Sequence, residues 1–173
     1  MSEVGLTVSA GRSYDLAVSI AVTVTVPEGI VLAADSASTV MAPEGVLNVY
    51  EHVTKIAQIR MPRENKGLPI GAVAVGAGAI GTRNVQSLLA EFNLTLREDE
   101  TTAEDLDPKT VSKLLLRFLS DRAVTVTPGM SPAQLMVAVC GYGTNRFLPE
   151  QWRFTVPTDE KPARYREPLQ DGQ

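Results

Sequence analysis

Residues 29–36 have the sequence GIVLAADS, an apolar run that ends in a carboxylate and a hydroxyl. Residues 17–26 precede it and alternate strictly, with Val or Ile at every second position and Ser, Ala or Thr between them. A period of two is typical of a β-strand, and the intervening Pro-Glu-Gly favours a turn. The two runs therefore predict a β-hairpin. Because residues 30–34 are apolar on both faces, we expect them to form a covered, central strand.

Strand-like segments also occur further along the chain. Residues 36–52 are mixed and contain Pro43 and Gly45, which predicts a loop. Residues from 157 onward are polar and predict a tail. Short apolar runs of strand character occupy residues 53–59, 70–75, 135–140 and 152–156.

Two amphipathic helices are predicted between the second and third of these runs. The first has apolar residues at i, i+3, i+4 and i+7, and the second starts at Asp107 as N-cap with Pro108 in the first helical position. Strands and helices are thus clustered, which favours an α+β fold over alternating βαβ units. The inner positions are Val85, Leu88, Leu89 and Phe92 in the first helix, and Val111, Leu114, Leu115, Phe118 and Arg122 in the second.

Composition excludes several classes of function. The chain has 173 residues, enough for one domain, and its 16 basic and 20 acidic residues give a formal charge of −4. That balance predicts no binding to nucleic acid, and no apolar run suggests a membrane span. A single cysteine, Cys140, and a single histidine, His52, predict neither an internal disulfide nor a zinc site. With no secretory signal in residues 1–15, we expect a cytoplasmic protein without a cofactor.

One motif suggests an alternative function. Residues 76–81, GAGAIG, match G-x-G-x-x-G between a predicted strand and a predicted helix, as in a dinucleotide-binding turn. That motif normally follows the first strand of its fold, whereas here about four predicted strands precede it. The small residues could also serve close packing between a strand and a helix. Dinucleotide binding through Gly76 and Gly81 is therefore the less favoured alternative.

The string GIVLAADS, the Lys55-Ile56 pair and the run Ala74-Val75-Gly76 resemble the N-terminal half of proteasome β-type subunits. These proteins are N-terminal nucleophile (Ntn) hydrolases with a four-layer αββα sandwich. The resemblance covers roughly residues 19–156 in element order. It implies an Ntn-hydrolase-like sandwich that lacks its C-terminal helices, and a hydrolase that cleaves peptide or amide bonds.

The resemblance also assigns roles to four residues. Ser19, which lies 16 residues before Asp35, takes the place of the nucleophile, and Asp35 and Lys55 take the places of the supporting carboxylate and ammonium. Gly76 takes the place of the glycine whose N–H stabilises the oxyanion. The chemistry explains these needs: a hydroxyl requires an adjacent base, and a backbone donor must face the developing negative charge.

This sequence departs from the family pattern at two points. Val18 stands before Ser19 where self-cleaving members usually have glycine, and a polar tail follows residue 156 where the family continues with helices and strands. We therefore expect a leader or propeptide-like segment at 1–18, the hydrolase-like domain at 19–156 and a polar tail at 157–173. An apolar sheet face left without helices predicts a homo-oligomer.

Other interpretations of the same residues stay open. The chain could be a non-catalytic assembly subunit, because an internal Ser19 has no free amine to act as base. Ser19 could be an outward residue of an edge strand, Asp35 and Lys55 could form a structural ion pair, and Gly76 could serve packing. The mass of the mature chain would distinguish these interpretations.

Overall fold

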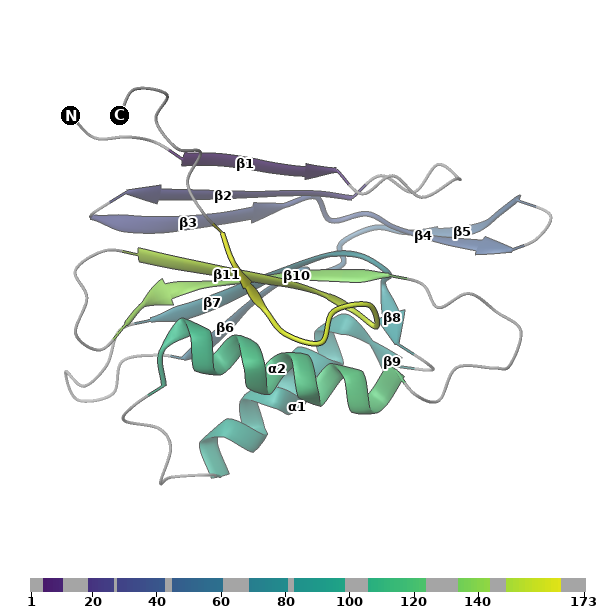
Figure 1. Cartoon of the computed structure of the whole chain (residues 1–173). Helices are drawn as coiled ribbons and strands as arrows, with labels where there is room; N and C mark the ends of the chain where they lie inside the picture. Colours follow the sequence, from purple (N-terminus) through teal and green to yellow (C-terminus); the bar gives the residue numbers. More distant parts are fainter. Residues whose placement is uncertain are drawn as a thin grey trace.

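The structure is a computed structural model that describes residues 5–10, 19–26, 28–42, 45–60, 69–80, 83–98, 106–123, 134–143 and 149–165. It has a mixed α+β architecture in three layers (Figure 1): a three-stranded upper sheet, a five-stranded lower sheet, and two helices beneath the lower sheet. The expected α+β class is confirmed.

The upper sheet contains the hairpin predicted from the sequence. Strands β2 (Ile20–Val26) and β3 (Gly29–Ala34) pair antiparallel, and β1 (Gly5–Ala10) adds to the other edge of β2. The sheet order is β1-β2-β3. The expectation that residues 30–34 are central and covered is wrong, because β3 is an edge strand whose Val31 is 61% exposed. Its second apolar face points away from the lower sheet.

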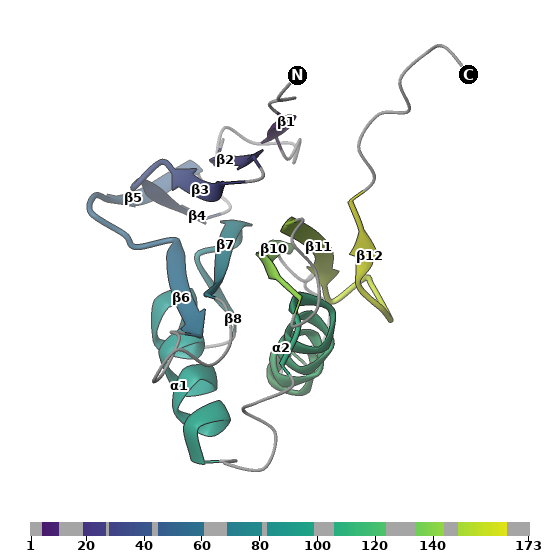
Figure 2. The ribbon, with the colours of Figure 1, turned by 90° about the vertical axis from the view of Figure 1, so that its left-hand side faces the viewer.

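The lower sheet is antiparallel, with the order β12-β11-β10-β7-β6. Three of the predicted strand runs pair side by side as β6 (Ile56–Arg60), β7 (Ile70–Gly76) and β10 (Leu135–Tyr142), and the fourth lies within β11 (Pro149–Val156). The predicted tail instead contributes β12 (Ala163–Arg164), which pairs with β11 at the sheet edge. Figure 2 shows β12 beside β11, next to α2.

Both predicted helices are present beneath this sheet. Helix α1 (Val85–Glu98) begins after Asn84, whose Oδ1 accepts a hydrogen bond from Ser87 N at 2.7 Å. Helix α2 (Pro108–Ala123) begins after Asp107, whose Oδ1 accepts one from Thr110 N at 2.6 Å. The predicted N-cap at Asp107 is therefore confirmed.

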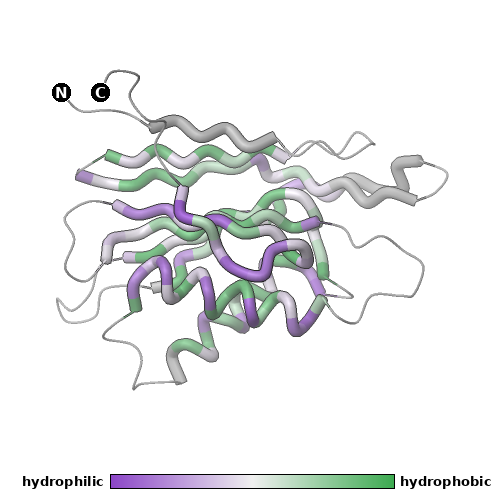
Figure 3. The backbone as a smooth tube through the Cα atoms, viewed as in Figure 1, coloured by the Kyte–Doolittle hydropathy of each residue, from purple (hydrophilic) through white to green (hydrophobic). Residues whose placement is uncertain are grey.

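The main core lies between the helices and the lower sheet. The predicted apolar stripe of α1 is buried there, together with Val111, Leu115 and Leu119 of α2. Leu114, predicted on the inner edge of α2, is 38% exposed, because the helix turns Leu115, Leu116 and Leu119 inward instead. A smaller cluster around Ala21, Val73 and Val75 joins the two sheets. The hydropathy colouring in Figure 3 shows hydrophobic residues in all three layers.

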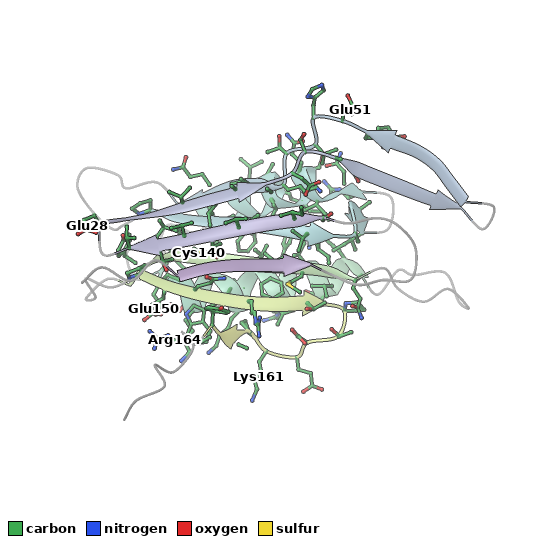
Figure 4. All side chains as sticks on the ribbon, turned by 90° about the horizontal axis from the view of Figure 1, so that it is seen from above. Glu28, Glu51, Cys140, Glu150, Lys161 and Arg164 are labelled. Carbon is green, nitrogen blue, oxygen red and sulfur yellow. The ribbon has the colours of Figure 1, made fainter. Side chains whose placement is uncertain are left out.

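Two further antiparallel pairs lie outside these sheets. The predicted loop at residues 36–52 contains β4 (Ser38–Ala42) and β5 (Gly45–Tyr50), which pair with each other. Seen from above in Figure 4, this hairpin extends beyond the end of the upper sheet. The short strands β8 (Ala79–Ile80) and β9 (Arg83–Asn84) form a second pair just before α1.

Candidate functional site

Three of the four predicted site residues meet at one end of the upper hairpin. Lys55 Nζ donates hydrogen bonds to Ser19 Oγ at 3.1 Å and to Asp35 Oδ2 at 2.8 Å. Ser19 directly precedes β2, Asp35 directly follows β3, and Lys55 directly precedes β6. The structure therefore places a hydroxyl, an ammonium and a carboxylate in one hydrogen-bonded chain.

The antiparallel hairpin explains why Ser19 and Asp35 are neighbours. In such a hairpin the start of one strand lies beside the end of the other. The two strands are closed at this point by a bond from Asp35 N to Ile20 O at 3.1 Å and by one from Ile20 N to Asp35 Oδ1 at 2.8 Å. Asp35 thus holds the backbone next to Ser19 with one carboxylate oxygen and Lys55 with the other.

Lys55 comes from the lower sheet and bridges to the upper one. Its carbonyl oxygen accepts a hydrogen bond from Ala74 N of β7 at 2.9 Å, and nearby Val53 N donates to Ser36 O at 2.8 Å. These two bonds fix the chain on both sides of Thr54. The Lys55 side chain is only 8% exposed, so its ammonium group has few water contacts. Asp35 supplies the counter-charge that water would otherwise screen.

The electrostatics of Asp35 follow from these contacts. Partial burial alone would raise the pKa of its carboxyl group. The hydrogen bond from Lys55, the backbone N–H donors of Ile20 and Ala37, and the Lys55 charge outweigh that effect and hold the pKa below its usual value. Asp35 is therefore a carboxylate at neutral pH and a counter-charge for the ammonium.

Gly76, the fourth predicted site residue, lies at the end of β7 and lines a small recess together with Lys55 and Gly78. Its φ of +97° is a conformation that favours glycine. A Cβ atom there would lie inside van der Waals contact with the carbonyl oxygen of Gln134. Local geometry therefore already requires glycine at this position, whatever its part in chemistry.

The structural context expected for a dinucleotide-binding turn is not formed. The segment after Gly76 enters β8 and β9, and α1 begins only at Val85, so the glycines do not open a helix. Strand β7 is also antiparallel to both of its neighbours, whereas a dinucleotide-binding turn follows a parallel strand. Close approach explains one of the small residues, because a Cβ at Gly78 would collide with the Ser38 side chain.

Sequence reasoning missed the residues that support the site from a distance. The bond between Ser36 and Val53 and the approach of Ser38 to Gly78 depend on how the chain returns from the β4–β5 hairpin. No local pattern signals either contact. Cys140 does not compete as a nucleophile, because it is buried and burial raises the pKa of its thiol to about 12.

In the described part of the chain, no cluster of three or more His, Cys, Asp and Glu side chains could hold a metal ion. Within the same residues, no helix is both long and apolar enough to cross a membrane. No protein-family model matches the sequence, and no curated protein matches it closely enough to mark a relative.

Proposed function

We propose that the protein is an N-terminal nucleophile hydrolase that cleaves peptide or amide bonds with Ser19 as its nucleophile. The observation that supports this most directly is the chain of contacts from Ser19 Oγ through Lys55 Nζ to Asp35 Oδ2, at 3.1 and 2.8 Å. A buried ammonium that donates to a hydroxyl stabilises the alkoxide that forms as the proton leaves. The Asp35 carboxylate is the counter-charge of that ammonium and holds it in position.

The proposed reaction uses the α-amine of Ser19 as its base. Ser19 Oγ attacks the carbonyl carbon of the substrate, and its proton passes to the α-amine. The α-ammonium then gives that proton to the leaving nitrogen as the C–N bond breaks, which leaves an ester on Ser19. Water, deprotonated by the same amine, hydrolyses the ester and restores the hydroxyl. The backbone N–H of Gly76 is our candidate donor to the oxyanion.

The free amine requires cleavage of the Val18–Ser19 peptide bond. In our proposal Ser19 Oγ attacks the carbonyl carbon of Val18, the hydroxyl proton passes to the Ser19 nitrogen, and the C–N bond breaks to give an ester and a free α-amine. Hydrolysis of that ester by water ends the covalent connection between residues 1–18 and the rest of the chain, and leaves Ser19 as the first residue of the processed chain. The peptidase or amidase activity is therefore expected only in the processed chain.

The test is the mass of the purified protein, followed by labelling with a serine-directed electrophile. We expect a chain that starts at Ser19 and carries one label on that residue, and an intact, unlabelled chain in the Ser19→Ala variant. Ser36→Ala is the matched control, because this exposed serine contributes its backbone oxygen to the bond with Val53. Intact, unlabelled wild-type protein would contradict the proposal.

A non-catalytic assembly subunit is the second candidate function. The observation that favours it is Val18 in the place where self-cleaving members of the resembled family have glycine. In that case Ser19, Asp35 and Lys55 form a structural polar cluster that closes the hairpin. The same mass measurement decides between the two candidates, because an assembly subunit keeps residues 1–18.

A further inference from the structure

Strand β1 lies in the segment that the proposed cleavage would detach covalently from the rest of the chain. It pairs with β2 along its whole length, from Gly5 opposite Thr25 to Ala10 opposite Ile20. In the sheet order β2 lies between β1 and β3, and β1 has β2 as its neighbour in the described sheets. Figure 4 shows the three strands side by side from above. The segment on the N-terminal side of the proposed cut therefore contains the strand that completes the upper sheet.

The direction of the β2 backbone shows which groups depend on β1. Ile20 O accepts its hydrogen bond from Asp35, so Ile20 directs its backbone groups toward β3. Hydrogen bonding alternates along an antiparallel strand. The N–H and C=O groups of Ala21, Thr23 and Thr25 therefore point toward the edge that β1 occupies.

Two of these three residues are buried. Ala21 is 8% exposed and Thr23 is 4% exposed, and the Thr23 hydroxyl donates to Gln151 Oε1 of β11 at 3.0 Å. Thr23 thus ties the upper sheet to the lower one. Pairing with β1 keeps the backbone groups of Ala21 and Thr23 hydrogen-bonded next to this contact between the sheets, whereas loss of β1 would leave that edge of β2 to water.

We propose that the β2 edge is a strand-binding site whose ligand is the chain's own segment 5–10, and that this segment stays bound after the chain is cut between β1 and Ser19. Main-chain hydrogen bonds supply the recognition, as in other cases of strand addition to a sheet edge. Cleavage of the chain by its own Ser19 rests on the proposed function. The binding of segment 5–10 to the β2 edge does not depend on that function.

The first experiment cuts the full chain with an added protease. Residues 12–17 are replaced by a specific protease site in a Ser19→Ala background, so the result does not depend on any activity of the chain itself. After the cut, we expect the N-terminal fragment to co-elute with the rest of the chain in gel filtration and to separate in denaturant. A fragment that elutes separately under native conditions would overturn the proposal, and the proposed hydrolase would be unaffected.

The second experiment tests recognition by backbone hydrogen bonds. A fluorescent peptide of residues 1–12 competes for the cut protein with two proline variants. T7P removes an N–H that points toward Thr23, and V8P removes one that points to the free edge, where proline is tolerated. We expect T7P to bind at least about tenfold more weakly than V8P. Equal binding of the two variants would contradict recognition of this edge.

Discussion

Lys55 is the residue through which the two sheets share one site. Its backbone belongs to the lower sheet through Ala74, and its ammonium group bonds to Ser19 and Asp35 at the end of the upper hairpin. A hydrogen-bonded pair of opposite charge in this position has little water to compete with it. A change in the distance between the two sheets would therefore move the Lys55 ammonium relative to Ser19 and Asp35.

Removing the charge of Asp35 should destabilise the protein in a pH-dependent way. In Asp35→Asn the Lys55 ammonium keeps its position but loses its counter-charge, and we expect a loss of about 2 kcal/mol at neutral pH. Because the pKa of Asp35 is lowered in the folded protein, its contribution is complete above the unfolded value of 3.8 and disappears as the pH falls through the folded value. The difference between the wild type and the variant should therefore begin to shrink only as the pH falls below about 4.

Thermal unfolding of both proteins from neutral pH down to about pH 3 measures this difference. Asp121→Asn is the matched control, because Asp121 is exposed on α2 and its substitution should leave the pH dependence unchanged. A wild-type advantage that grows as the pH falls would contradict the assigned role of Asp35.

Replacing Gly76 by alanine should destabilise the fold regardless of catalysis. The added Cβ would meet the Gln134 carbonyl oxygen, and the φ of +97° is unfavourable for any residue with a side chain. We expect Gly76→Ala to lower the free energy of unfolding by about 2 kcal/mol or more. Gly29→Ala is the control, because nothing lies within 4 Å of a Cβ at that position. Denaturant melts in which the two variants lose equal stability would contradict this account.

The site residues differ in how far the sequence could predict them. The neighbourhood of Ser19 and Asp35 follows from a hairpin whose alternation and turn are local features, so it can be derived from the residues. The position of Lys55 beside them depends on which strand of the lower sheet lies under the hairpin. Only the family resemblance predicts that position. The strain at Gly76 depends on the strand beside it, β10, about 60 residues later.

At the scale of helices and strands, the sequence predicts those elements whose apolar residues recur with a clear helical or strand period. Both helices and the β2–β3 hairpin have strong patterns, and the helix caps at Asn84 and Asp107 use side chains suited to that position. Strands β4 and β5 are not predicted because Pro43 and Gly45 favour a loop, whereas in the structure Gly45 begins β5 and pairs with Ala42. Strand β1 is not predicted because its pairing with β2 depends on tertiary structure rather than on a local sequence pattern.

The cap of α2 offers a test at this scale. Asp107 Oδ1 accepts a hydrogen bond from Thr110 N, and its carbonyl accepts one from Val111 N. Asp107→Ala removes the first of these bonds and should cost about 1 kcal/mol of stability. For a chain of this size, the melting temperature should fall by about 2–4 °C.

Asp107→Asn is the conservative variant, since asparagine is an equally good N-cap. It should therefore keep most of the stability that the alanine variant loses. Should both substitutions lower the melting temperature equally, the negative charge rather than the capping bond would be responsible.

At the scale of the whole molecule, the outer face of the upper sheet is an exposed apolar surface. Val31 is 61% exposed and Ile20 is 45% exposed, and Val22 and Val24 lie on the same outward face of β2 as Ile20. The helices cover the opposite side of the molecule (Figure 1), so this apolar face has no layer above it among the described residues. We propose that it packs against the same face of a second copy, as sheets do in a sandwich.

The size of this face limits the affinity to expect. Three strands of about six residues span on the order of 300 Å², well below the roughly 800 Å² per partner of a stable interface. Self-association should therefore be weak and dependent on concentration, and sedimentation velocity over a concentration series measures it. Val31→Glu places a charge within the interface and should shift the protein to a monomer with little loss of stability. Leu94→Glu, at a residue that is 58% exposed on α1, changes the charge equally on the opposite layer and should leave the association unchanged. A wild-type protein that stays monomeric at every concentration, or equal effects of the two substitutions, would rule out this face as the contact between copies.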